Sequence, residues 1–488
     1  MSINELLRIF PREYLFERKI LPVEEPDGRV KLLICPDTDP WSLHNISVTL
    51  EQPFFTHKIS STDLLKELRL MMEKNYATPG EVIEKDMQGR GDASVATEKM
   101  HQDLLEYGQD NGAVKFVNSV LMEALRFGAT DVHFQPVDNA SMVVRYRIDG
   151  ILRDTHRIDG PLVKSVCARV KVISKMDLTQ KRIPQDGRTS VTNADKKVEI
   201  RVSSLPTSNG ERLVLRLLDK DNLFFPSPQL GLEPDQHQCM KRMMERSSGM
   251  ILVTGPTGCG KTTTLYSFIS EMNLHERNVM TIEDPVEYHL PDISQMQVQP
   301  KIGLDFAQGL RAILRQDPDV ILVGEIRDQQ TARIAIRAAL TGHLVLSTLH
   351  TNDAVGALTR LMDLDVEPYL INDALIGVLS QRLLRKTCSS CKVQKTVPAE
   401  MFHRSEMLVS IGAGCSECFG SGYRGRTGVY EILSLESEKL KMLLSTKAKE
   451  NNIRDAVSQE GFIPLTQVGL KKIEDGVTDV QELTRVLG

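Results

Sequence analysis

Residues 255–263 have the types and the spacing of a loop that binds phosphate. The segment fits the pattern G-x-x-x-x-G-K-[ST]; it follows the apolar run Met250 to Val253 and leads into a helix-compatible segment near Lys261. Glycines let backbone N–H groups turn inward around phosphate oxygens, and a helix N-terminus favours an anion. We therefore expect Lys261 to reach the β- and γ-phosphates of a nucleotide and the Thr262 hydroxyl to bind Mg²⁺. The residues expected around the phosphates are Gly255, Pro256, Thr257, Gly258, Cys259, Gly260, Lys261, Thr262 and Thr263.

Two carboxylates further along the chain could complete a hydrolytic site. Glu325 follows the apolar run 320–323, and Glu283 follows the run 279–282. Because Gly324 stands where many nucleotide hydrolases have a metal-binding aspartate, we expect Glu325 to act in the network of metal and water. Glu283 would be a general base or a water-positioning residue. Taken alone, the acidic cluster around Glu283 is better explained by a solvated turn.

Two histidines flank another strand-like segment, residues 344–349. His343 precedes the segment and His350 follows it. A single histidine is more often a packed or exposed residue than a functional one. A pair that flanks one core strand indicates sensors of the γ-phosphate.

The eight cysteines form two sets. Four are scattered singly, as is typical of small buried residues in a reducing compartment. The other four form two C-x-x-C pairs, namely Cys388, Cys391, Cys415 and Cys418. Four thiolates suit a closed, tetrahedral Zn²⁺ site with a structural role, whereas disulfides fit a cytosolic chain poorly and an iron–sulfur cluster is a further alternative. We expect the 23 residues between the pairs to form a loop or a short helical arm.

The elements around these residues predict an α/β fold. After the phosphate-binding loop, strand-like runs at 279–282, 320–323 and 344–347 alternate with helical segments. Such alternation is typical of a mostly parallel sheet covered by helices. Upstream, residues 111–220 predict an α+β domain, and residues 221–235 predict an interdomain linker.

The first 110 residues predict a small docking domain without a catalytic constellation. Strand-like pieces occur at 30–35 and 46–50, and a helical pattern covers 63–74. Residues 81–101 are polar and charged, which is typical of a flexible connector.

Composition and charge exclude several classes of protein. Hydrophobic residues make up 41% and charged residues 26% of the chain, which is typical of globular proteins. The net charge of −5, without interleaved basic and aromatic stripes, predicts no nucleic-acid partner. The first ten residues lack the pattern of a signal peptide, and the most apolar candidate for a membrane span, 369–384, is interrupted by polar residues. We therefore expect membrane association only through partners.

Four of these segments occur together, in the same order, in the type II/type IV secretion ATPases. They are 255–262, 283–287, 324–328 and 343–353, and the chain also resembles that family upstream at 129–136, 146–150, 183–188 and 205–207. The resemblance covers the chain from about residue 111 to its end. It implies a cytoplasmic, hexameric motor that uses ATP and Mg²⁺. In that picture a RecA-like P-loop domain, 236–488, holds the nucleotide and the preceding PAS-like domain closes over it.

The resemblance also implies roles for five arginines near the phosphates and for the tetracysteine segment. Arg201 and Arg216 match family arginines that approach the phosphates from the preceding domain, Arg311 and Arg315 match a second pair, and Arg426 matches a phosphate-side contact. Positive charge delivered across a boundary stabilises developing phosphate charge, although each arginine alone could be a surface ion pair. A tetracysteine arm, here 386–420, is familiar in motors that assemble secretion apparatus, and retraction motors generally lack it.

The chain resembles most the ATPases of type II secretion systems, which hydrolyse ATP to drive pseudopilus assembly and protein export across the outer membrane. The resemblance implies a peripheral location at the cytoplasmic face of the inner membrane, bound to platform proteins. The compact segment 1–110 favours this function over a type IV pilus assembly (extension) ATPase or a DNA-uptake pilus motor. A nucleotide-binding scaffold without hydrolysis and a RecA-like nucleic-acid motor are alternatives from other classes.

Overall fold

The computed structural model describes residues 112–488, apart from 139, 194–195, 219–224 and 400–403, and short pieces of the first 111 residues. Those pieces include a sheet of β1 (Ile20–Glu24), β2 (Val30–Ile34) and β3 (Phe55–Lys58). β2 confirms the strand expected at 30–35, but Ile46 is helical rather than extended. Except for Leu64, the helix expected at 63–74 and the connector at 81–101 lie outside the described residues.

A central sheet of seven strands, in the order β12-β11-β13-β14-β10-β15-β18, organises the second half of the chain. Its strands are β10 (Gly249–Thr254), β11 (Val279–Glu283), β12 (Ser294–Gln297), β13 (Val320–Val323), β14 (Leu344–Leu349), β15 (Leu375–Thr387) and β18 (Tyr423–Ser434). All neighbouring pairs are parallel except β15 and β18, which are antiparallel. The expected α/β fold with a mostly parallel sheet is therefore confirmed.

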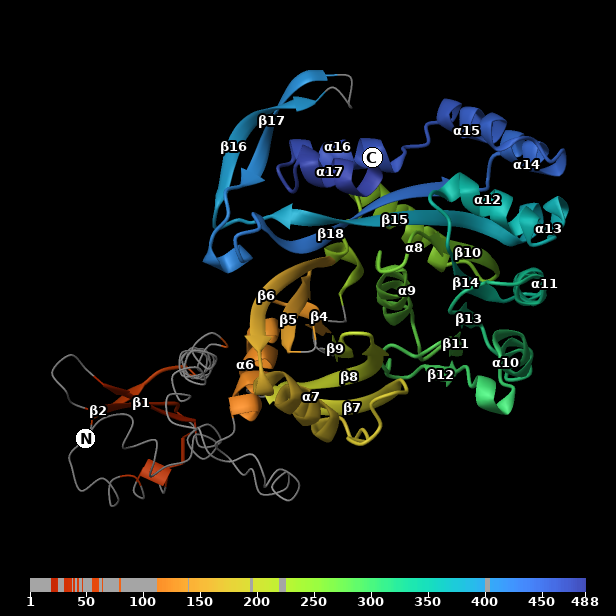
Figure 1. Cartoon of the computed structure of the whole chain (residues 1–488). Coiled ribbons are helices and arrows are strands. Elements are labelled where there is room, and N and C mark those ends of the chain that lie inside the picture. The colour runs from red at the N-terminus through yellow and green to blue at the C-terminus, as the bar shows by residue number, and fades with distance from the viewer. Residues whose placement is uncertain are drawn as a thin grey trace.

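Helices cover both faces of the central sheet because its strands are apolar on both sides (Figure 1). In β10, Ile251 and Val253 pack on one face with α8 (Pro234–Met244) and α9 (Lys261–Ser270). Met250 and Leu252 point to the opposite face. The helices on that face are α10 (Phe306–Ile313), α11 (Gln329–Leu340), α12 (Ala354–Asp363), α13 (Pro368–Ala374), α14 (Glu438–Ser445) and α15 (Glu450–Gln459).

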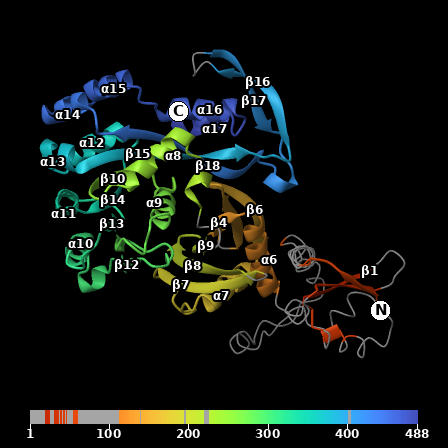
Figure 2. The same ribbon diagram turned by 180° about the vertical axis from the view of Figure 1, so that it is seen from behind.

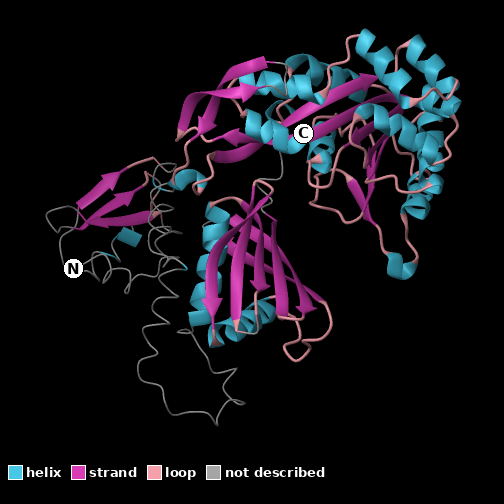
Figure 3. Ribbon diagram, turned by 45° about the horizontal axis from the view of Figure 1, so that its top comes forward, coloured by secondary structure: helices cyan, strands magenta, loops and turns pink. Residues whose placement is uncertain are grey.

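A smaller sheet of six antiparallel strands, in the order β6-β5-β4-β9-β8-β7, precedes the central sheet in the chain. Its strands are β4 (Ala129–Pro136), β5 (Ser141–Ile148), β6 (Ile151–Asp159), β7 (Gln185–Asn193), β8 (Lys196–Thr207) and β9 (Gly210–Leu218). Two helices, α6 (Gly112–Arg126) and α7 (Pro161–Ile173), share its core and lie along one face (Figure 3). β6 and β7 were not expected; both are edge strands, which bury few side chains and therefore carry a weak hydrophobic pattern.

The arm between the two cysteine pairs is a β-hairpin, so the expectation of a loop or a short helical arm is wrong. The hairpin consists of β16 (Lys392–Ala399) and β17 (Arg404–Gly412), which pair antiparallel. Met407 and Val409 alternate with exposed residues and pack against α16, which explains the strand conformation. The chain ends with α16 (Leu465–Glu474) and α17 (Val480–Leu487). Of the helices in the described part of the chain, none has both the length and the apolar character needed to cross a membrane.

Candidate nucleotide site and tetracysteine site

The glycine-rich loop lies at the carboxyl end of β10, where it turns directly into α9. Gly255, Gly258 and Gly260 have φ of 146°, 78° and 89°, a region that side chains disfavour. A Cβ on Gly255 would stand 2.6 Å from the carbonyl oxygen of Gln381. The Gln381 side chain, on the neighbouring strand β15, donates its Nε2 to the Cys259 carbonyl at 2.7 Å. β15 therefore supports the loop, a role that the sequence alone did not reveal.

Lys261 folds back over this loop. Its Nζ donates to the carbonyl oxygens of Gly255 at 2.8 Å and Pro256 at 3.1 Å. Burial lowers the pKa of the Lys261 ammonium from its ordinary value, and the charge of Glu325 partly opposes this shift. Thr262 and Thr263, both half-buried, follow in the first turn of α9. The arrangement places a cation and a helix N-terminus on the same small loop, which suits polyphosphate.

Lys261, His350 and Glu325 come together at this edge of the sheet. His350 Nδ1 lies 3.5 Å from Lys261 Nζ, and His350 Nε2 lies 3.5 Å from Glu325 Oε2. The other oxygen of Glu325 accepts a hydrogen bond from Arg327 at 2.5 Å. These residues follow β10, β14 and β13, which are adjacent and parallel, so their carboxyl ends meet in one place.

Glu283 is held in a hydrogen-bond network close to α9. Its carboxylate accepts hydrogen bonds from the Tyr266 hydroxyl, from Thr281 Oγ1 at 2.6 Å and from Gln295 Nε2 at 3.2 Å. Glu283 is 3% exposed, and both of its oxygens have donors. Burial, followed by the charge of Glu283, raises the pKa of Tyr266. Sequence reasoning missed Tyr266 and Gln295, since only the fold brings them to this carboxylate.

His343 lies at the opposite end of the sheet, where the parallel strands begin. The Gly249 N–H, at the start of β10, donates to the His343 carbonyl at 3.1 Å, and His343 Nδ1 lies 3.0 Å from the Ala338 carbonyl. The whole of β14, six residues or about 20 Å, separates it from His350. The expected role of His343 as a γ-phosphate sensor does not fit this placement within one chain.

Arg201 and Arg216 are cross-strand partners on the smaller sheet, and Arg201 reaches the turn that follows β11 of the central sheet. Arg201 donates to the Val286 carbonyl at 3.3 Å, within the acidic turn 283–287. The buried Arg201 Nε has no hydrogen-bond acceptor among the described residues. Arg216 donates to Asp131 at 3.1 Å and keeps 61% of its side chain exposed.

The remaining expected arginines lie elsewhere. Arg311 on α10 and Arg315, two residues after the end of this helix, are both exposed, and Arg315 donates to the Arg311 carbonyl at 2.9 Å. On β18, Arg426 lies four residues from Tyr430, the partner of Gln381 beside the loop, which corresponds to about 13 Å. Instead of facing the loop, Arg426 pairs with Asp149 of the smaller sheet at 3.5 Å.

The four paired cysteines meet at the base of the hairpin. Their sulfur atoms all lie within 4.8 Å of one another, and the separations of Cys388 from Cys415 and of Cys391 from Cys418 are both 3.9 Å. Sulfur atoms bound to one tetrahedral Zn²⁺ lie about 3.8 Å apart, so the set fits this ion and is too open for disulfides. Although burial opposes ionisation of Cys418, N–H donors from Cys415 and Gly422 lower its pKa to about 6.

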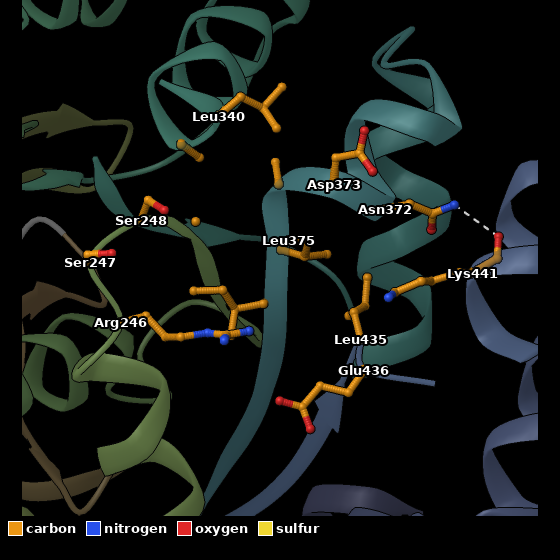
Figure 4. Close-up of a pocket in the computed structure, with 14 residues that line it drawn as sticks. Arg246, Ser247, Ser248, Leu340, Asn372, Asp373, Leu375, Leu435, Glu436 and Lys441 are labelled. Atoms are coloured by element: carbon orange, nitrogen blue, oxygen red, sulfur yellow. Dashed lines mark hydrogen bonds between the residues drawn. The ribbon is translucent and has the colours of Figure 1, made fainter. Parts of the chain in front are cut away.

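A cavity of ≈ 430 Å³ lies at the end of the central sheet away from the glycine-rich loop (Figure 4). It is lined by residues around the start of β10 and the end of α13, including Arg246, Asp373, Glu436 and Lys441. Asn372 donates to the Lys441 carbonyl across its rim at 2.9 Å. The cavity has no glycine-rich loop, so we do not assign the nucleotide to it.

Known proteins resemble the chain over most of its length. The family described as Type II/IV secretion system protein matches residues 107–485. Type II secretion system protein E of Dickeya dadantii is 39% identical over 493 residues, which cover 100% of this chain and 98% of that protein. Type II secretion system ATPase E of Vibrio cholerae is 44% identical over 392 residues, which cover 79% and 77%.

A solved structure agrees with these relatives. The crystal structure of the pilus retraction motor PilT with bound ADP has a TM-score of 0.51 and 26% identity, covering 75% of this chain and 95% of that one. The chain therefore belongs to the family of type II/IV secretion system proteins.

Proposed function

We propose that this chain is the ATPase motor of a type II secretion system, which hydrolyses ATP to drive pseudopilus assembly and protein export across the outer membrane. The observation that carries the proposal is the cluster of Lys261, His350 and Glu325 beside the glycine-rich loop. A cation, a titratable ring and a carboxylate in contact at the carboxyl edge of a parallel sheet suit phosphoryl transfer to water.

Each residue of the site has a distinct part in this proposal. The loop N–H groups and Lys261 bind the phosphates, while Thr262 and Glu325 would hold Mg²⁺ and its water shell. Mg²⁺ would neutralise charge that develops on the phosphate oxygens. Glu325 is the proposed base because, among the described residues, one of its oxygens faces only His350. Glu283 is less suited to this role, since both of its oxygens already accept hydrogen bonds from buried side chains. His350 would sense the γ-phosphate, and Glu283 would fix the acidic turn that Arg201 contacts.

We also propose the finer organisation of the molecule. Residues 236–488 form a RecA-like domain, 221–235 the linker, 111–220 a PAS-like domain and 1–110 the segment that binds inner-membrane platform proteins. The motor would act as a hexamer at the cytoplasmic face of the inner membrane. The contact between Arg201 and the Val286 carbonyl supports closure of the PAS-like domain over the nucleotide.

The four cysteines would hold Zn²⁺ in a structural role. The separations of their sulfur atoms and the backbone N–H donors to Cys391 and Cys418 support four thiolates around one ion. Metal analysis of the purified protein distinguishes a zinc site from an iron–sulfur cluster. A zinc site gives about one zinc per chain and no iron, whereas a cluster gives iron.

Hydrolysis is tested with phosphate release from Mg-ATP by the wild type, Lys261→Ala and Lys164→Ala. Lys164 is an exposed lysine on α7 and serves as the matched control. We expect the first variant to lose turnover by at least about 100-fold with an unchanged melting temperature, and the control to keep full activity. Undiminished turnover in Lys261→Ala would rule out the proposed site.

The client system is tested by complementation. Expressed in cells that lack either the type II secretion ATPase or the pilus assembly ATPase, the chain should restore protein export and should not restore pilus extension. Restoration of pilus extension alone would favour the type IV pilus alternative.

A further inference from the structure

The tetracysteine site touches the smaller sheet of the same chain. Phe419 directly follows Cys418, and its ring lies 4.7 Å from the ring of Phe127 in an edge-to-face arrangement at 69°. Phe127 directly follows the end of α6. Figures 1 and 2 both show the base of the hairpin beside α6 and β6. Aromatic pairs with this geometry contribute more than their buried area alone.

A second contact lies next to the first. Asp149, in the turn between β5 and β6, accepts a hydrogen bond from the Gly425 N–H at 2.8 Å. Its other oxygen lies 3.5 Å from Arg426 Nε. Asp149 keeps only 16% of its side chain exposed, so this ion pair is partly shielded from solvent.

The conformation of the cysteine segment determines where Phe419 lies. Phe419 has φ of 52°, in the left-handed region that phenylalanine disfavours. The turn that holds it there contains Gly420 N–H to Cys415 carbonyl at 2.9 Å and the N–H of Gly422 to Cys418 Sγ at 3.2 Å. Four thiolates held this closely repel one another unless a cation binds them. The bound metal would therefore stabilise the strained turn.

We propose that the tetracysteine site is a docking surface for the smaller sheet. In this proposal the metal fixes Phe419 and the segment up to Arg426, and thereby holds the two sheets in the arrangement that brings Arg201 to the acidic turn. The site then has a function beyond supporting its own hairpin. It couples metal occupancy to closure around the nucleotide.

The experiment compares hydrogen exchange and metal content in the full-length protein and three variants. Phe419→Asn keeps a residue that tolerates φ above zero but removes the ring, and Asp149→Ala removes the second contact. Asp154→Ala is the control, because Asp154 lies on β6 and pairs with Arg145 within the smaller sheet. We expect both test variants to keep about one zinc per chain, and the amides of residues 122–128 and 423–426 to exchange about 2–10-fold faster than in the control.

Removal of the metal with a chelator gives an independent readout. We expect the backbone amides of residues 122–128, which lie outside the hairpin and its cysteines, to exchange faster after the metal is removed. Acceleration confined to residues 386–422 would overturn the proposal, as would unchanged exchange at 122–128 in a zinc-loaded Phe419→Asn protein.

Discussion

Glu431 connects the loop that carries His350 to the C-terminal helices, and its substitution offers a demanding test. This carboxylate on β18 is 3% exposed. Its two oxygens accept hydrogen bonds from the N–H of Ala354 at 2.7 Å and of Leu465 at 3.0 Å. Ala354 and Leu465 are the first residues of α12 and α16, so two positive helix ends converge on one anion.

The substitution Glu431→Gln keeps one acceptor oxygen and turns an NH₂ group toward the second N–H. It removes one hydrogen bond to a charged group and leaves a buried donor unsatisfied, which costs about 3 kcal/mol. Burial raises the pKa of Glu431, so the comparison is made at pH 8, well above the ordinary pKa of a glutamate. A loss of this size lowers the melting temperature of a domain of this length by about 6–12 °C.

The assay is thermal unfolding of the wild type, Glu431→Gln and Glu436→Gln. Glu436 is an exposed glutamate shortly after the same strand and controls for the change in net charge. We expect Glu436→Gln to melt within about 1 °C of the wild type. If Glu431→Gln melted as high as this control, the two helix ends would not depend on the carboxylate and the reasoning would be refuted.

Three further predictions concern single residues of the same framework. Gly255→Ala should weaken ATP binding by about 100-fold in a titration with a fluorescent ATP analogue, because its Cβ would meet the Gln381 carbonyl, while Gly303→Ala, with open space around it, should bind normally. Burial acts to raise the pKa of Glu482, but hydrogen bonds from Arg485 and Arg385 outweigh burial and lower the pKa from 4.5. The ionised carboxylate therefore contributes its full stability above pH 4.5, and this contribution is lost as the pH falls through the lowered pKa. The melting temperature of the wild type should therefore exceed that of Glu482→Gln at pH 7, with a gap that narrows below pH 4.5; a constant gap would contradict the assignment. His350→Ala should lower kcat for ATP hydrolysis by about 10–100-fold and His343→Ala should leave it unchanged, since only His350 lies beside Lys261; equal losses would contradict the placement of the two residues.

Local patterns were sufficient to predict the elements that are both buried and regular. β10, β11, β13 and β14 are short, largely apolar and buried, and a parallel sheet must place their carboxyl ends at the same end of the sheet. The proximity of Glu325 and Lys261 follows from that rule.

Other placements depend on relations that no local pattern encodes. His343 and His350 are the same type of residue at the two ends of one strand. Only the direction of β14 shows that His350 lies at the end of the sheet that carries the glycine-rich loop and that His343 lies at the other end. The family resemblance placed Arg426 on the phosphate side, but the length of β18 carries it beyond the loop to Asp149. The hairpin was missed because it packs on α16, which comes much later in the chain.

The most direct test of the proposed site separates binding from chemistry in Glu325→Gln. ATP binding and single-turnover hydrolysis are measured on the same preparation of this variant and of the wild type. We expect an ATP affinity within about threefold of the wild type, because the loop, Lys261 and Thr262 are intact, and a hydrolysis rate lower by at least about 100-fold, because the carboxylate that activates water and helps to hold Mg²⁺ is lost. Hydrolysis at the wild-type rate in Glu325→Gln would contradict the assignment of this edge of the sheet as the catalytic site.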